Sequence, residues 1–390
     1  MTRREWLRTS GILGSALVAS VTSALDKQDK PPLMNLNDPV TPRSQAIDNI
    51  FTRAGLKAGH DPGAAVVVAN HEGVLFQRGY GVIDLRSLRK VDSSTNFRLA
   101  SCTKQFTATA IMLLVHDGKL RYDDRLTNIF ADFPDYGRAI AIRHLLNHTS
   151  GLEDYEDLMP APDPKVSVEQ SQIHDAGVFD LLKRQRSTKF SPGSKWAYSN
   201  SGYVLLGLVV HKVSGKTFPD FLHQRIFQPL TMRNTIAYVR GVNEVPNRAF
   251  GHSLEGNSWV RTDQSPTSAT LGDGGVYSSL DDLAKWNQAL RRNTLLSQQE
   301  MQPALTAVKL PDGHVTGPDG SPAAYGFGWF LDPYQGHQRM WHYGETIGFR
   351  TAIQRFVADD LTIIILCNRA DLNPSALALQ VADLFLERAA

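Results

Sequence analysis

The feature of the sequence that most constrains the fold is a run over residues 106–115 in which almost every residue is apolar or small. Gly118 follows this run, and glycine is the residue that most often ends a helix. A helix without a polar face is normally buried inside a large core. The run therefore predicts a central helix that other segments of the chain surround.

Two polar residues, Ser101 and Lys104, stand at the start of this helix. Their spacing puts both side chains on one face of the first turn. A serine can act as a nucleophile when a neighbouring base takes its proton. Partial burial and the positive end of the helix dipole both favour the neutral form of a lysine. Ser101 and Lys104 are therefore candidates for nucleophile and base. The same spacing recurs at Ser87 and Lys90, in a charged stretch that is typical of a turn or strand edge.

Composition narrows the classes of function. The 390 residues include 41 basic and 39 acidic ones, and no basic block follows the N-terminal segment. We therefore expect no nucleic-acid partner. Two cysteines, Cys102 and Cys367, are too few for a disulfide framework or a zinc site. His144 and His148 are four residues apart, which is a metal-ligand spacing on a helix, but no third ligand accompanies them in the sequence. We expect neither a metal nor a cofactor.

The N-terminal segment, residues 1–24, resembles an export signal. Several arginines form a basic start, residues 11–21 are apolar or small, and residues 22–24 offer a small-residue cleavage site. The pair Arg3-Arg4 resembles the twin-arginine signal, which implies bacterial export of a folded protein to the periplasm or beyond. The alternative is an uncleaved anchor, but the apolar run is short for a span. We expect a mature protein without a stable membrane span, and an extended proline-containing linker over residues 25–43.

The remaining chain, residues 44–390, predicts one α+β domain. Strand signals in 60–95 and 320–370 enclose a mostly helical region over about 96–295, so distant segments would close one sheet. The expected helices lie at 46–56, 142–152, 178–183, 202–213, 218–227, 280–291 and 376–388. The expected strands lie at 64–70, 74–81, 325–331, 339–343, 349–356 and 361–367, and an acidic surface loop is expected at 153–176.

Two further short motifs carry candidate chemistry. Tyr198 and Asn200 lie in a loop that leads into a helix, and they form the one Tyr-x-Asn pattern of the chain. A phenol close to an ammonium group loses its proton more readily than a free phenol. His342 and Gly344 lie at the end of a late strand, where a histidine can line a cleft along the strand edge. Each motif alone is equally compatible with a structural role.

Together the motifs have a recognisable order. Ser101-Cys102-Thr103-Lys104, Tyr198-Ser199-Asn200 and His342-Tyr343-Gly344 resemble the signature of the serine β-lactamase and penicillin-binding protein superfamily. The Tyr-x-Asn version is similar to the class C branch, which includes family VIII-type esterases and D-amino-acid peptidases. The resemblance covers about residue 45 to the C-terminus. It implies a β-lactamase/transpeptidase-like fold, with an antiparallel sheet, flanking helices, a mostly helical subdomain and the active site between them.

The resemblance also implies catalytic roles. Ser101 would be the acylated nucleophile, and Lys104 would accept its proton. Tyr198 would be the partner base and later the acid that protonates the leaving group.

Further roles concern binding. Asn200 would hold Lys104 and a substrate amide, and His342 and Gly344 would occupy the substrate-binding strand. The oxyanion hole would consist of the backbone N–H groups of Ser101 and Glu345, and such donors lower a barrier by about 3–4 kcal/mol.

The chain departs from the family pattern at two positions. His342 stands where β-lactamases and carboxypeptidases usually have lysine, and Tyr343 replaces a small hydroxyl residue. A neutral imidazole lacks the charge that assists a hydrogen bond to a substrate carboxylate. We therefore expect short-chain esters or uncharged amides to be preferred over β-lactams.

The sequence thus predicts an exported serine hydrolase that forms an acyl-enzyme with an ester, amide, D-peptide or β-lactam. Its partner would be a small-molecule or peptidoglycan-type substrate. The alternative is a non-catalytic, penicillin-binding-like receptor for cell-wall fragments. The oligomeric state does not follow from the sequence.

Overall fold

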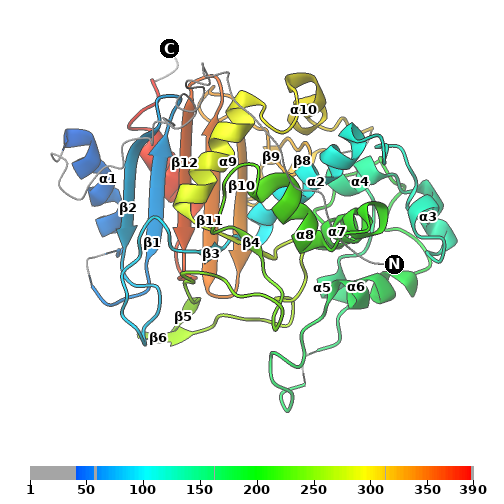
Figure 1. Ribbon diagram of the computed structural model, residues 1–390, viewed down its shortest axis with the longest axis horizontal. Helices are drawn as coiled ribbons and strands as arrows, with labels where there is room; N and C mark the ends of the chain where they lie inside the picture. Colours follow the sequence, from blue (N-terminus) through cyan, green and yellow to red (C-terminus); the bar gives the residue numbers. More distant parts are fainter. Residues whose placement is uncertain (1–40, 57–58, 162, 312, 388–390) are drawn as a thin grey trace, which may run out of the picture. The chain divides into compact units, whose positions relative to one another are not determined.

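The computed structural model describes residues 41–387, apart from 57–58, 162 and 312 (Figure 1). The expected export signal over residues 1–24 and most of the expected linker over 25–43 lie outside the described residues. Helix α1 (Pro42–Arg53) begins inside the end of that linker, because Thr41 caps it and shares a reciprocal side-chain cap with Ser44.

A five-stranded antiparallel sheet forms the centre of the fold. Its strand order is β10 (Arg339–Thr346), β11 (Phe349–Phe356), β12 (Leu361–Cys367), β1 (Ala64–Ala69) and β2 (Val74–Tyr80). Strands β1 and β12 are far apart in the sequence, yet Val67 lies opposite Ile364. The expected closure of one sheet by the two ends of the domain is therefore confirmed.

Helices cover both faces of this sheet. Val66 and Ile365 pack on the side of α1 and α11 (Pro374–Ala382). Val67 and Ile364 belong to the larger core with α2 (Lys104–His116) and α9 (Leu280–Arg292). Because β1 and β12 are buried on both faces, their sequences are continuously apolar instead of alternating.

The helical region lies beside the β10 edge of the sheet (Figure 1). Its core is α2, which is buried from Lys104 to Leu114, as expected from its apolar sequence. The short 3-10 turn η1 (Ala100–Thr103) leads into α2. The other elements here are α3 (Leu126–Ile129), the 3-10 turn Asp135–Ala139, α4 (Ile142–Leu146), α5 (Tyr155–Leu158), α6 (Asp175–Lys183), α7 (Asn200–Ser214), α8 (Phe218–Leu222), the π-helical turn His223–Phe227 and α10 (Gln298–Leu305).

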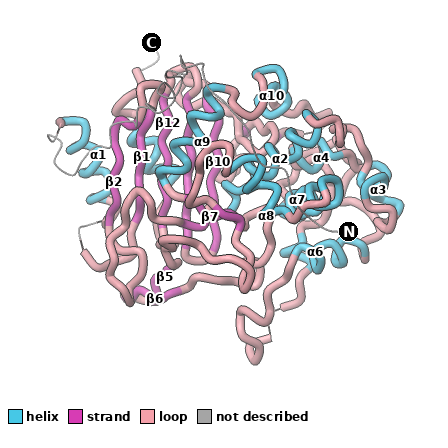
Figure 2. The backbone as a smooth tube through the Cα atoms, in the orientation of Figure 1, coloured by secondary structure: helices cyan, strands magenta, loops and turns pink. Residues whose placement is uncertain are grey.

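Short strands that the sequence did not reveal pair with one another outside the central sheet (Figure 2). They are β3 (Phe97–Arg98), β4 (Ile236–Ala237), β5 (His252–Glu255), β6 (Ser258–Arg261), β7 (Val276–Ser278), β8 (Val315–Thr316) and β9 (Pro322–Ala323). Strands of two to four residues are too short to show a periodic pattern.

Three expectations about local structure were wrong. The terminal helix expected at 376–388 ends at Ala382, the last residue of α11. Residues 325–331 form no strand, although Tyr325 and Phe330 make isolated bridges. The expected surface loop at 153–176 contains α5, whose Tyr155 is fully buried. Among the described residues, no helix combines the length and apolarity that a membrane span requires.

Candidate active site

The nucleophile candidate lies in the turn η1. Ser101 is partly exposed, whereas Cys102, Thr103 and Lys104 beside it are buried. Ala100 has φ +47°, in the left-handed region that residues with a side chain rarely adopt. Such strain persists where the surroundings hold the chain firmly. The turn therefore presents one accessible hydroxyl from an otherwise buried segment.

Lys104 points its amine at three oxygen atoms. Its Nζ lies 3.1 Å from the Oγ of Ser101, 2.8 Å from the Oδ1 of Asn200 and 3.0 Å from the carbonyl oxygen of Asp273. The last two atoms can only accept hydrogen bonds. A neutral amine therefore uses both of its N–H groups on them, and its lone pair is left facing the Ser101 hydroxyl. This is the arrangement of a base that is ready to take the serine proton.

The environment of Lys104 also favours the neutral amine. Burial lowers its pKa from 10.5 to about 8, against the opposing effects of the Asp273, Asp154 and Glu156 carboxylates. Desolvation disfavours the charged form of a lysine, and the nearby negative charges limit that effect. A substantial fraction of the amine is therefore neutral just above neutral pH.

Tyr198 lies beside the same pair. The Lys104 amine is 4.9 Å from the centre of its ring. Burial holds the pKa of Tyr198 well above 10, and the contact of its hydroxyl with Ser101 acts in the opposite direction. That contact is not a full hydrogen bond, because the buried hydroxyl has no partner of good geometry among the described residues. The expectation of an easily deprotonated phenol is therefore wrong for the free protein, and Tyr198 is available as a proton donor.

His148 forms the wall behind Tyr198. Their rings lie 4.3 Å apart, and the Nδ1 of His148 accepts the N–H of Ser199 at 3.1 Å. Burial lowers the pKa of His148 well below 6.5, so the ring is neutral. His144 instead contacts the backbone of Ala141. The two histidines therefore support different backbone segments.

Asn200 connects Lys104 to a pair of carboxylates at α5. Its side-chain oxygen faces the amine, so its NH₂ group points to the Oε1 of Glu156 at 3.1 Å. The Oδ2 of Asp154 accepts the backbone N–H of Asn200 at 2.6 Å. Partial burial raises the pKa of both carboxyl groups, although Glu156 remains solvent-accessible. Asp154 and Glu156 thus orient Asn200 and place negative charge at the site.

Strand β10 is an edge strand and brings its backbone to the nucleophile turn. Trp341 exchanges both backbone hydrogen bonds with Phe330, on the side away from β11. Backbone groups of an antiparallel strand alternate in direction, so the N–H of Glu345 lies on this same outer edge. Gly344 lets the strand approach η1, since a Cβ there would lie 2.1 Å from the carbonyl oxygen of Leu99. This packing suits the expected oxyanion hole of the Ser101 and Glu345 N–H groups.

The position of His342 differs from the expectation of a ring that faces substrate. The side chain is fully buried. Its Nδ1 lies 2.6 Å from the carbonyl oxygen of Tyr343 and its Nε2 lies 3.1 Å from the hydroxyl of Tyr325. Burial, together with the charge of Lys104, lowers its pKa to about 3. The ring is neutral, its two nitrogens are engaged, and the strand offers the site its backbone instead.

The site also contains residues to which the sequence assigned no catalytic or binding role. They are His148, Asp154, Glu156, Asp273 and Tyr325, none of which belongs to the three short motifs. The local signals are the spacing of His144 and His148, which is typical of metal ligands, and the acidic composition of 153–176, which predicts a surface loop. Within the described residues, no three His, Cys, Asp or Glu side chains gather as metal ligands would.

Comparisons with known proteins show the family and the fold of this chain. The family model described as Beta-lactamase matches residues 49–386. Penicillin-binding protein 4* of Bacillus subtilis is 31% identical over 341 residues, which are 83% of this chain and 72% of that protein. A D-aminopeptidase of Brucella canis is 27% identical over 79% of this chain, but the match spans only 56% of that longer protein.

A solved structure extends the likeness to three dimensions. The D-amino acid amidase of Ochrobactrum anthropi SV3 has a TM-score of 0.74 and 25% identity, over 88% of this chain and 98% of the amidase. The fold is therefore the β-lactamase/transpeptidase-like one that the motifs implied. Since the family match spans most of its length, this chain belongs to the β-lactamase family, a family of serine hydrolases.

Proposed function

We propose that this protein is an exported serine hydrolase that forms an acyl-enzyme on Ser101. One observation carries the proposal. The two amide-type acceptors around Lys104 direct the lone pair of its amine to the Ser101 hydroxyl, 3.1 Å away. Burial supplies the neutral amine that this geometry needs. Export rests on the arginine pair and apolar run of residues 1–24.

In the first half of the reaction, the Ser101 Oγ attacks the carbonyl carbon of an ester or amide while Lys104 takes the hydroxyl proton. The N–H groups of Ser101 and Glu345 hydrogen-bond the oxyanion, a contribution of about 3–4 kcal/mol for one such donor. Tyr198 then donates its proton to the leaving oxygen or nitrogen as the carbon–heteroatom bond breaks. The Lys104 ammonium returns a proton to Tyr198, which leaves a neutral amine and an acyl-serine.

In the second half, water replaces the leaving group. Lys104 accepts a proton from the water as its oxygen attacks the acyl carbon. The same N–H groups stabilise the second oxyanion. The Ser101 oxygen then leaves and regains a proton through Lys104 and Tyr198, so the free enzyme is restored and the acid is released.

Charge at the site favours a substrate class. Asp154 and Glu156 place carboxylates near Lys104, and His342 is neutral and buried. Arg350, near the start of β11, is already paired with Glu345 at 2.8 Å. We propose that neutral esters and acyl groups carrying an amine are preferred over substrates that carry a carboxylate next to the reacting carbonyl. The relatives named D-aminopeptidase and D-amino acid amidase support amides of D-amino acids as the amine-bearing candidates.

Covalent labelling tests the nucleophile. A fluorophosphonate probe should label the wild-type protein, and Ser101→Ala should lose both labelling and hydrolysis with its fold intact. Ser87→Ala is the matched control, because Ser87 begins the second Ser-x-x-Lys pattern, and it should label normally. A folded wild-type protein that neither labels nor hydrolyses any ester would instead support the receptor alternative.

A substrate panel tests the proposed preference. We expect p-nitrophenyl acetate and D-alanine amide to be hydrolysed with higher kcat/KM than a D-Ala-D-Ala peptide or a chromogenic cephalosporin. Glu156→Gln should raise KM for the amide roughly tenfold by removing a charged partner of the amine, with little change for the acetate. Exposed Glu169 provides the control Glu169→Gln. Faster cephalosporin turnover than ester turnover would contradict this preference while leaving Ser101 as nucleophile.

A further inference from the structure

A cavity lies on a part of the fold away from the candidate active site. It has a volume of about 320 Å³ and lies between the end of α9, helix α10 and the β11–β12 end of the sheet. Met340 lines it, whereas Gly344 on the same strand packs against the nucleophile turn. Those two residues are roughly 14 Å apart along β10, at about 3.4 Å per residue. The cavity is therefore separate from the catalytic site, and its volume suits a small molecule.

One of the residues that line this cavity is a buried cation. Arg355 is 6% exposed, and its Nε donates to the Oδ1 of Asn287 at 2.8 Å. Among the described residues, the one acceptor of its Nη1 is the Met340 sulfur, at 3.1 Å, and a thioether is a weak acceptor. In the part of the chain that the structure describes, no carboxylate pairs with this guanidinium. A buried charge without a counter-ion is unfavourable. An anion bound in this cavity would therefore stabilise the Arg355 guanidinium.

The other charged groups at the cavity do not neutralise the charge of Arg355. Arg291 adds a second guanidinium to the lining. Burial is the main cause that lowers the pKa of Arg355, and the charge of Arg291 lowers it further, to about 10. Arg355 is still protonated at neutral pH. Asp360, the carboxylate in the wall, is already shared by an ion pair with Arg291 and a contact with His71. The cavity thus keeps an excess of positive charge.

Apolar side chains form much of the remaining lining, together with the polar Asn293, Gln298 and Thr362. Phe356 and Leu361 close the sheet side. Leu305 on α10 and Val357 after β11 line the mouth and are 38% and 58% exposed. The apolar part of the lining beside a buried guanidinium matches a molecule with one anionic end and a hydrocarbon body. We propose that this cavity binds a medium-chain monocarboxylate, with its carboxylate on Arg355 and its chain against the apolar wall. A guanidinium fork matches the two oxygens of a carboxylate.

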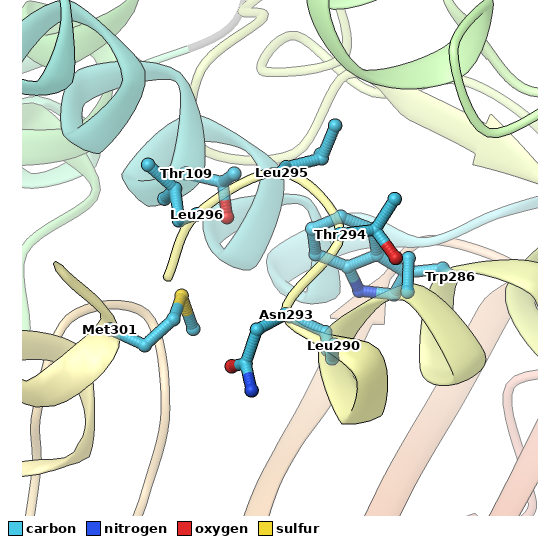
Figure 3. Close-up of a pocket in the computed structure, with 9 residues that line it drawn as sticks. Thr109, Trp286, Leu290, Asn293, Thr294, Leu295, Leu296 and Met301 are labelled. Carbon is cyan, nitrogen blue, oxygen red and sulfur yellow. The ribbon is translucent and has the colours of Figure 1, made fainter. Parts of the chain in front are cut away.

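A much smaller space adjoins the cavity. Figure 3 shows it under α2, with Trp286, Thr294 and Leu296 around it. Leu290, Asn293 and Met301 line both spaces. Its volume of about 10 Å³ has room for no more than about one water molecule. The ligand is therefore assigned to the larger cavity alone.

Calorimetric titration with octanoate tests the proposal on the wild-type protein. Octan-1-ol, which has the tail without the charge, and inorganic phosphate, which has a charge without the tail, are the comparison ligands. We expect saturable binding of octanoate and binding at least roughly tenfold weaker for both comparison ligands. The titration is repeated after fluorophosphonate labelling of Ser101, and binding should persist because the cavity is separate from the catalytic site.

Variants locate the binding. Val357→Glu places a negative charge at the exposed mouth and should weaken octanoate at least roughly tenfold. Val242→Glu, at a valine that is 78% exposed and does not line the cavity, should bind normally. Both should hydrolyse p-nitrophenyl acetate at the wild-type rate. Arg355→Gln should also lose octanoate, and if it does not fold, Val357→Glu decides. The proposal is overturned by equal octanoate affinity in the two glutamate variants, by equal binding of octan-1-ol, or by loss of binding after labelling.

Discussion

Individual protonation states decide what the candidate catalytic residues can do. Lys104 and Tyr198 are both buried beside Ser101, but burial has opposite consequences for them. It lowers the pKa of the amine and raises that of the phenol, because in both cases it disfavours the charged form. The neutral form is a base for lysine and an acid for tyrosine. Their proposed roles therefore follow from the same desolvation.

The pH dependence of acylation should follow the titration of the Lys104 amine. Because the neutral amine is the base and its pKa is about 8, kcat/KM for p-nitrophenyl acetate should be low in acid and rise with pH through about 8. Lys104→Ala should slow acylation by about 10²–10⁴-fold, as expected for loss of a general base. Single-turnover rates from about pH 6 to about pH 9.5 measure both effects. A wild-type rate in a folded Lys104→Ala protein would remove this residue from the mechanism.

The Tyr198→Phe variant distinguishes the proposed proton donor, Tyr198, from the proposed base, Lys104. The phenol is protonated throughout the neutral range, so its removal should lower the rate most for substrates with poor leaving groups, such as amides. The rise near pH 8 should remain, because it belongs to Lys104. Rates for an amide and for p-nitrophenyl acetate, measured against pH, give the comparison. Disappearance of the rise near pH 8 in Tyr198→Phe would assign that titration to the coupled pair instead.

Secondary-structure elements set the distance between the nucleophile and the strand that complements it. The edge strand β10 packs directly on η1, and Gly344 is the point of closest approach. The two-residue hairpin Ile347-Gly348 joins β10 to β11 and places Thr346 opposite Phe349. That register directs the Glu345 N–H outward. Gly344 and the tight turn thus align the backbone N–H of Glu345 as a hydrogen-bond donor.

Gly344→Ala tests this alignment. Its Cβ would overlap the carbonyl oxygen of Leu99, so β10 must move away from η1. We expect about 10²–10³-fold lower kcat, the range for loss of one oxyanion-hole donor, and about 1–3 kcal/mol lower stability from overpacking. Gly118→Ala is the control, because a Cβ there meets nothing within 4 Å although φ is +68°. It should lose about 1 kcal/mol of stability through backbone strain without losing kcat. Similar kcat in both variants would contradict the role of Gly344.

At the scale of the whole molecule, one sheet is assembled from the two ends of the domain, and the helical region lies between them in sequence. The β1–β12 pairing therefore requires residues about three hundred positions apart to meet, a topology rich in non-local contacts. Such topologies fold slowly. This suits the proposed twin-arginine route, which implies export of a protein that has already folded.

Replacing both arginines with lysine tests that route. The change at Arg3 and Arg4 keeps the positive charge but removes the pair on which the resemblance rests. We expect the precursor to stay in the cytoplasm, with its activity intact in lysates. Cell fractionation and immunoblotting against the wild-type chain measure the result. Unchanged appearance of the mature protein outside the inner membrane would refute the twin-arginine route and leave a general secretory signal.

Much of the fold was predictable because burial leaves a local pattern. The apolar run of α2, the paired strands β1 and β2 and the position of α9 all follow from patterns among neighbouring residues. The short strands were not predictable, and neither was the irregular backbone at Tyr325. Tertiary contacts decide those segments, because a two-residue strand such as β3 exists only where β7 pairs with it.

The site divides in the same way. The sequence by itself determined the motif residues Ser101, Lys104, Tyr198 and Asn200, since their order and spacing are local. Only the tertiary structure decided their charges and partners, because desolvation and electric fields depend on groups that are distant in the chain. It placed His342 in the core, where its ring is neutral, and it brought Glu156 to Asn200. The motifs in the sequence predict the type of chemistry. Packing decides which of these groups are neutral and which lie close enough together to take part in it.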